Sequence, residues 1–154
     1  MEVLKYIEYL NNLFEETTSL NPHKYYNWGG CYQFALLLKK KFPEGKIAVT
    51  HELMHVVFYY KGDYFDVDGI FHNTDDIIET EEALPPTVLR IISSYGYDEK
   101  TERPKRDYLK VYDGFSFDEQ EEIYNFCMAH NCIALLNELE WREEQIWLSL
   151  KIIV

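Results

Sequence analysis

Cysteine is scarce in this chain, and its few copies are not spaced as linked pairs. The 154 residues contain Cys31, Cys127 and Cys132, an odd number whose spacing matches neither a disulfide framework nor paired zinc knuckles. We therefore expect free thiols in a reducing compartment. Without disulfides, the fold has to be held by a hydrophobic core.

Long apolar runs are also missing. No window approaches the roughly eighteen uninterrupted apolar residues that indicate a membrane-spanning helix. The first residues, "MEVLKYIEYLNN", lack the basic region, apolar core and cleavage site of a signal peptide. We therefore expect a cytoplasmic protein that has no membrane partner.

Positive charge is the third shortage. The chain has 15 Lys and Arg against 27 Asp and Glu, which gives a net charge of −12 and a pI near 4.8. Such a chain offers no basic surface to neutralise a phosphate backbone, so we expect no nucleic-acid partner. A protein, peptide or amide substrate fits better, and the acidic surface favours a basic one. The sequence leaves the oligomeric state open.

What the chain does have is enough apolar material for one compact domain over residues 1–154, with 47% hydrophobic and 16% aromatic residues. Apolar residues recur at helical spacing over 3–16 and 31–42. β-Branched and aromatic residues fill 46–50 and the stretch from 55 to about 70, which predicts a strand and a β-hairpin. We therefore predict an α+β fold in which an antiparallel sheet packs against an N-terminal helix pair.

The C-terminal half carries weaker patterns. The stretches "VLRIIS" (88–93) and "DYLKVY" (107–112) predict strands from their β-branched and aromatic content. Ser116 and Glu119 match a capping box that begins a helix reaching to about 130. The tail over 132–154 is typical of a further helix that runs into a final strand. The predicted fold thus includes an additional C-terminal helix.

A short metal motif lies at the start of the hairpin, where His51-Glu52-Leu53-Met54-His55 spells HExxH. In a zinc hydrolase both histidines lie on one helix face and bind the metal, and the glutamate is the general base. The residues after His55, however, favour a strand. In a strand, His51 and His55 would be about 13 Å apart, too far to share one zinc ion. We therefore predict no metal and no cofactor, interpret His51 as a turn residue, and keep the zinc-dependent metallohydrolase as an alternative.

Cys31 stands at the predicted start of the second helix. Unpaired backbone N–H groups and the positive end of the helix dipole lower the pKa of a thiol placed there, which makes it a stronger nucleophile at neutral pH. Gly29 and Gly30 allow a substrate backbone to approach the sulfur closely, and Trp28 is a candidate wall of a cleft. These residue types together favour a reactive site over a buried structural cysteine.

The hairpin offers a base and an acid for that nucleophile. If Lys61-Gly62 is a two-residue turn, Asp68 lies directly opposite His55 and Asp66 lies diagonal to it, all on one face of the hairpin. A three-residue turn would reverse the faces and separate both acids from the histidine. The sequence does not choose between Asp66 and Asp68.

The segments "NWGGCYQFALLLKKKFP" and "HVVFYYKGDYFDVDG" resemble the cysteine, histidine and aspartate blocks of the papain-like and transglutaminase-like cysteine hydrolase superfamily, in particular its small phage and bacterial members. The resemblance covers residues 25–70, the expected catalytic core. It implies Cys31 as nucleophile, His55 as base, and Asp66 or Asp68 as the acid that orients the histidine. It also implies hydrolysis or transfer of an acyl group through an acyl-enzyme, as in peptidases, amidases and deamidases.

One part of the family pattern is missing. The glutamine that donates to the oxyanion in papain-type enzymes has no counterpart before Cys31, so the Cys31 N–H and the Asn27 side chain are the candidate donors. Because this element is absent, a second alternative stays open besides the zinc enzyme. The chain would then be a non-catalytic factor that binds and inhibits another protein through the same fold.

Overall fold

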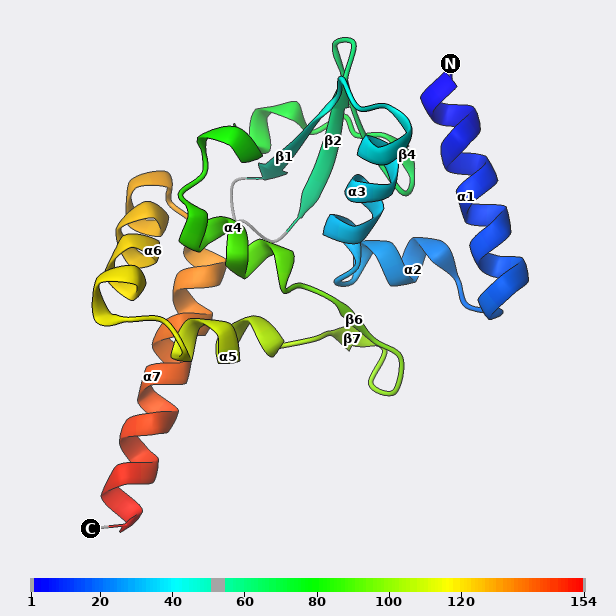
Figure 1. The fold of residues 1–154 in the computed structure, drawn as a ribbon. Helices are drawn as coiled ribbons and strands as arrows, with labels where there is room; N and C mark the ends of the chain where they lie inside the picture. Colours follow the sequence, from blue (N-terminus) through cyan, green and yellow to red (C-terminus); the bar gives the residue numbers. More distant parts are fainter. Residues whose placement is uncertain (1, 51–54, 154) are drawn as a thin grey trace.

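The computed structural model describes residues 2–50 and 55–153, apart from the side chains of residues 78, 145 and 149–153, and it has an α+β architecture (Figure 1). The helices are α1 (Glu2–Thr18), α2 (Pro22–Asn27), α3 (Cys31–Lys41), α4 (Pro86–Ser93), α5 (Asp107–Asp113), α6 (Phe117–His130) and α7 (Ile133–Ile153). The strands are β1 (Lys46–Thr50), β2 (Val56–Tyr60), β3 (Asp63–Asp66), β4 (Gly69–Ile70), β5 (Ile77–Thr80), β6 (Tyr97–Asp98) and β7 (Arg103–Pro104), with short 3₁₀ turns at Thr74–Asp76 and Glu81–Ala83.

An antiparallel sheet in the order β4-β3-β2-β1-β5 forms the centre of the molecule, as predicted. The β2–β3 hairpin has the predicted two-residue turn, because Tyr60 pairs with Asp63. Lys61 and Gly62 both have positive φ, at 48° and 88°, as type I′ hairpin turns require.

This turn brings Asp66 beside His55, as predicted. The predicted position of Asp68 opposite His55 is wrong, because β3 ends at Asp66 and Asp68 lies in the turn that leads to β4.

Helix α3 covers one face of the sheet and carries the start of the candidate site (Figure 1). Its buried residues Phe34, Ala35 and Leu38 recur at helical spacing and pack in the same core cluster as Phe58 of β2. The periodicity predicted a helix over 31–42, which ends one residue later than α3 does. Since the buried face of α3 fixes its rotation against the sheet, it also fixes where the first residue, Cys31, lies.

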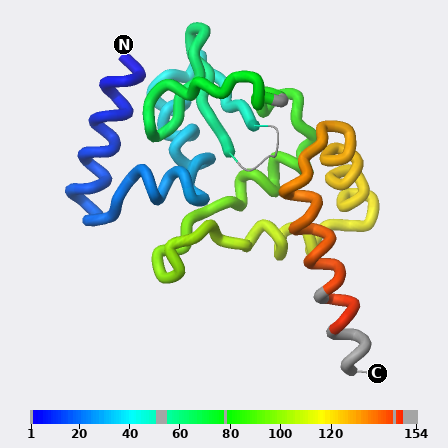
Figure 2. Tube along the Cα trace, turned by 180° about the vertical axis from the view of Figure 1, so that it is seen from behind, coloured from blue at the N-terminus to red at the C-terminus, as the bar shows by residue number. Residues whose placement is uncertain are grey.

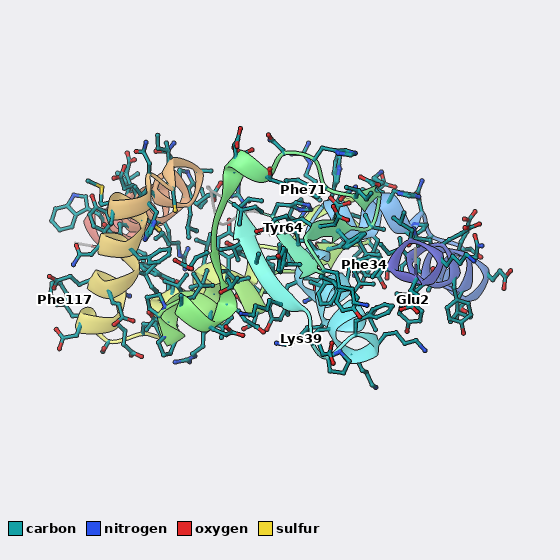
Figure 3. The ribbon with its side chains drawn as sticks, turned by 90° about the horizontal axis from the view of Figure 1, so that it is seen from above. Glu2, Phe34, Lys39, Tyr64, Phe71 and Phe117 are labelled. Atoms are coloured by element: carbon teal, nitrogen blue, oxygen red, sulfur yellow. The ribbon has the colours of Figure 1, made fainter. Side chains whose placement is uncertain are left out.

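Helices α4–α7 form a second group, on the opposite side of the molecule from α1 and α2 (Figure 1). Figure 3 looks down on the molecule, with α1, which carries Glu2, at one end and α6, which carries Phe117, at the other. Figure 2, which shows the molecule from behind, has α1 and α7 on opposite sides of the molecule. The capping box of α6 is confirmed, since Ser116 accepts from the Glu119 N–H and Glu119 accepts from the Ser116 N–H.

Three predictions for this half were wrong. The stretches 88–93 and 107–112 are the helices α4 and α5 rather than strands, and the tail remains helical in α7 to Ile153. In α4 the buried residues are Thr87, Val88, Ile91 and Ile92, which lie on one face only of a helix. Pro86 at the first helical position is preset for that conformation. Tertiary burial of this face has outweighed the strand preference of the β-branched residues.

Candidate functional site

Cys31 is the first residue of α3, as the sequence predicted. Only 3% of the surface of Cys31 is exposed. Gly30 is the N-cap, and no side chain in the described part of the chain caps this helix end. The sulfur therefore lies at a helix start whose backbone N–H groups and positive dipole end favour negative charge.

His55 directly precedes β2 and continues its ladder. The Thr50 N–H donates to the His55 carbonyl oxygen at 3.0 Å, and the Thr50 hydroxyl bonds both the His55 carbonyl and the His55 N–H, at 3.1 and 3.3 Å. These bonds hold the backbone of His55 beside Thr50, the last residue of β1. The imidazole is 23% exposed.

Asp66 is the acid that contacts this histidine. His55 Nε2 lies 3.0 Å from Asp66 Oδ2, and the Asp66 side chain is 12% exposed. The other carboxylate oxygen, Asp66 Oδ1, accepts the backbone N–H of Asp68 at 2.9 Å. Both oxygens are thus held, so the carboxylate fixes the orientation of the imidazole ring.

The same imidazole is hydrogen-bonded to Cys31. Burial lowers the pKa of His55, but the hydrogen bonds to Asp66 and Cys31 and the negative charges of both groups outweigh it and raise the pKa to about 9. At neutral pH this histidine is therefore cationic. Cys31, His55 and Asp66 form one connected chain of side chains from the start of α3, the residue before β2 and the end of β3.

Asp68 lies in the turn between β3 and β4 and makes a different contact. Its Oδ1 is 2.6 Å from His23 Nδ1, and its Oδ2 accepts from the Asn27 amide at 2.9 Å. Both side chains of the Asp68 and His23 pair are about half exposed, at 55% and 53%. Asp68 therefore connects the hairpin to α2. Of the two candidate acids, Asp66 is the one whose carboxylate contacts His55.

The residues predicted to shape the substrate site have other surroundings. The Asn27 amide group is bonded to Asp68. Trp28 is 50% exposed and has Lys24 Nζ 5.7 Å from its ring centroid, so it is a surface residue rather than a cleft wall.

Gly29 and Gly30 allow segments of the chain to pack closely against each other. A Cβ on Gly29, whose φ is 130°, would lie 1.9 Å from the Gly96 carbonyl oxygen, and one on Gly30 would lie 2.9 Å from that of Tyr25. These close approaches are filled by backbone from the same chain. They do not leave the room for a substrate backbone that the sequence suggested.

His23 is the contact that sequence reasoning missed. Its spacing in the sequence indicates no partner, but it pairs with Asp68 across 45 residues. The Asn21 side chain accepts the His23 and Lys24 N–H groups and so begins α2 beside the hairpin. A local capping signal was present in the sequence, but nothing in it indicated which distant residue α2 would meet.

The zinc motif is only partly within the described structure. His51 and Glu52 lie outside the described residues. Within 2–50 and 55–153, no group of three or more His, Cys, Asp and Glu side chains is placed to hold a metal ion. The one motif residue that is described, His55, has its Nε2 directed at Asp66.

A comparison with known families places the chain in one of them. The sequence pattern of a family described as phage YunG-like protein matches residues 6–99, which is more than half of the 154 residues. The chain belongs to the phage YunG-like family. The matched segment contains Cys31, His55 and Asp66, and it ends before β7. No curated protein and no solved structure matches the chain.

The membrane prediction can be compared with the helices. In the part of the chain that the structure describes, no helix combines the length and the apolar run that crossing a bilayer requires.

Proposed function

We propose that this member of the phage YunG-like family is a cysteine-dependent acyl hydrolase or acyltransferase of the peptidase, amidase or deamidase type. The observation that carries the proposal is the position of His55, which contacts Asp66 through Nε2 and is also hydrogen-bonded to Cys31. A nucleophile, a base and an orienting acid in contact are the arrangement that covalent acyl transfer requires.

The proposed reaction uses these three groups in turn. With Nε2 held by Asp66, Nδ1 of His55 takes the proton of the Cys31 thiol, and the sulfur attacks an amide or thioester carbonyl. The bond from the carbonyl carbon to the leaving group breaks, and His55 returns the proton to that group. Water, or an acceptor amine or thiol, then gives its proton to His55 and releases the acyl group from the sulfur.

The oxyanion of this reaction needs donors, and the contacts favour backbone over Asn27. The Asn27 amide already donates to Asp68, whereas the N-terminal N–H groups of α3, beginning with that of Cys31, have no side-chain cap. Donors at a helix start stabilise negative charge without moving during the reaction. We therefore assign the oxyanion to the Cys31 N–H in this proposal.

The finer fold assignment is part of the same proposal. The chain order of a cysteine at a helix start, a histidine before a strand and an aspartate on the next strand resembles papain-like and transglutaminase-like enzymes. The packing of α3 on β2 and β3 is consistent with that order. The α4–α7 region is not accounted for by the resemblance, which covers residues 25–70.

A non-catalytic inhibitory factor is the rival that one observation favours, because Cys31 is only 3% exposed. Under that alternative, Cys31→Ala leaves the function intact. The zinc-dependent hydrolase has a separate test. It requires one metal ion per chain, lost on substitution of His51 or His55, and elemental analysis of the purified protein measures this directly.

Selective alkylation tests the proposal within a single chain. With iodoacetamide below neutral pH, Cys31 is expected to react about tenfold faster than Cys127 or Cys132. All three cysteines are buried, so burial alone does not separate them. A hydrogen bond to Cys132 together with burial raises the pKa of Cys127, which makes Cys127 the unactivated reference. Trypsin separates the peptide with Cys31 (25–39) from the one with the other two (111–142), and mass spectrometry then follows each rate.

The proposal is wrong if Cys31 reacts no faster than Cys127 and Cys132 across this pH range. A faster reaction only above pH 8.5 or so, where ordinary thiols ionise, would equally contradict an activated nucleophile.

A further inference from the structure

A cavity of about 240 Å³ lies against the loop that leads into Cys31. Asn27 and Gly29 line it on one side, and Gly96 lines it on another. The backbones of Gly29 and Gly96 are in direct contact, because a Cβ added to Gly29 would lie only 1.9 Å from the Gly96 carbonyl oxygen. Figure 1 shows β6 and β7, which flank this cavity, next to the end of α2 and the start of α3. The cavity therefore adjoins the loop that precedes Cys31, although Cys31 itself is not among the lining residues.

The rim of this cavity is basic, in contrast to the chain as a whole. Arg103, Lys105 and Arg106 line it, although the net charge of the chain is −12. Arg106 is paired with Glu138 at 3.5 Å. Among the described residues, neither Arg103 nor Lys105 has an ion-pair partner. Two cations therefore face the cavity without a counter-charge.

The inner wall of the cavity carries a carboxylate. Glu138 lines the cavity beside Tyr108, with which it shares a hydrogen bond. The other carboxylate oxygen, Glu138 Oε2, is buried and has no hydrogen-bond partner within the described residues. Because this oxygen atom has no accessible surface, a ligand in the cavity cannot reach it. Recognition by this cavity therefore rests on the unpaired cations at its rim.

We propose that this cavity binds an acidic residue of the substrate, with its carboxylate between Arg103 and Lys105. The substrate class would then be an acidic peptide or amide, not the basic one that net charge suggested. This inference rests on the proposed function for its link to Cys31. The local arrangement of charge outweighs the net charge because exposed charges beyond about 10 Å are screened by salt.

Binding to the cavity is tested without any reaction, by NMR on the unmodified chain. N-acetyl-glutamyl amide is expected to shift the backbone amide signals of Gly29, Gly96 and Lys105 in a saturable way. N-acetyl-glutaminyl amide, which has nearly the same shape and no charge, is expected to bind about five- to tenfold more weakly. Equal shifts from both probes, or no shift from either, would overturn the proposal.

Matched variants assign the effect to the rim. The double variant Arg103→Gln, Lys105→Gln removes two exposed charges and is expected to abolish the preference for the glutamyl probe. Lys100→Gln removes one charge from the same β6–β7 hairpin, and Lys100 does not line the cavity, so this control is expected to keep the preference. Loss of the preference in Lys100→Gln as well would show general charge attraction and overturn the site.

The link to the nucleophile needs a second measurement. Chloroacetyl-Glu-amide and chloroacetyl-Gly-Glu-amide are compared with their Gln counterparts as alkylating agents for Cys31. At least one Glu reagent is expected to react about fivefold faster than its Gln match, and the double variant is expected to remove that advantage. Glutamyl-specific NMR shifts without any such advantage would overturn the substrate assignment. If the NMR preference is found but Cys31 proves unactivated, the carboxylate site is supported and only the proposed function fails.

Discussion

Replacing His55 with glutamine is expected to slow the alkylation of Cys31 by iodoacetamide about tenfold near pH 6.5. The reason is electrostatic, since the hydrogen bonds and charges around His55 raise its pKa to about 9 despite its burial. Below that pH the imidazole is cationic and stabilises the thiolate of Cys31. Glutamine keeps a polar side chain of similar length but carries no charge.

The pH dependence of this effect has a definite sign. An ordinary thiol has a pKa of about 8.5 and is almost fully protonated at pH 6.5, so the charge on His55 matters most there. As pH rises through about 9, the imidazole loses its proton and the unassisted thiol ionises by itself. The rates of the unmodified chain and His55→Gln are therefore expected to converge. A constant ratio across pH would contradict the ion-pair explanation.

The two aspartates provide a matched comparison for the same assay. Asp66→Ala removes the partner of His55 Nε2 and is expected to slow alkylation of Cys31 about three- to tenfold. Asp68→Ala leaves the Asp68 backbone N–H that Asp66 accepts and removes only the contacts to His23 and Asn27. It is expected to change the rate less than about twofold. A larger loss in Asp68→Ala would reverse the assignment of the acid.

Gly29→Ala is expected to lower the free energy of unfolding by about 3 kcal/mol or more. The added Cβ would meet the Gly96 carbonyl oxygen at 1.9 Å, and the φ of 130° is one that residues with a Cβ rarely adopt. The obstacle is backbone on both sides, so no side chain can rotate to relieve it. Urea unfolding followed by tryptophan fluorescence measures the change.

Gly62→Ala separates the two causes of this loss. Gly62 also has a positive φ, of 88°, but a Cβ there would meet no atom within 4 Å. Gly62→Ala is expected to lower the free energy of unfolding by about 1 kcal/mol, because only the backbone conformation is unfavourable for alanine there. If Gly29→Ala costs no more than Gly62→Ala, the close packing of the loop before Cys31 against β6 is not as described.

The sequence predicted the part of the fold whose signals are local. Cys31 begins α3 because a glycine pair precedes a run with apolar residues at helical spacing. His55 and Asp66 share a face because Lys61-Gly62 fits a two-residue turn and the hairpin register follows from it. The α+β class and the capped helix at Ser116 rested on equally local signals. These features needed no knowledge of distant contacts.

What the sequence could not predict depended on packing between distant segments. Asp66 and Asp68 were equivalent in the hairpin pattern, and only the position of α2 directs Asp68 to His23. The strand preference of 88–93 was outweighed because one face of α4 is buried. No sequence pattern distinguishes Arg103 and Lys105, and only the fold places them on the cavity beside Gly29.

Transfer of an acyl group to Cys31 is the most direct test of the proposed function. The purified chain is incubated with p-nitrophenyl acetate near neutral pH, and the acetyl group is located by mass spectrometry of tryptic peptides. The sulfur of Cys31 is expected to gain the acetyl group as p-nitrophenolate leaves, about tenfold faster than in the His55→Gln variant. Acetylation of Cys31 at the rate of Cys127 and Cys132, or at the same rate in both chains, would contradict a catalytic cysteine.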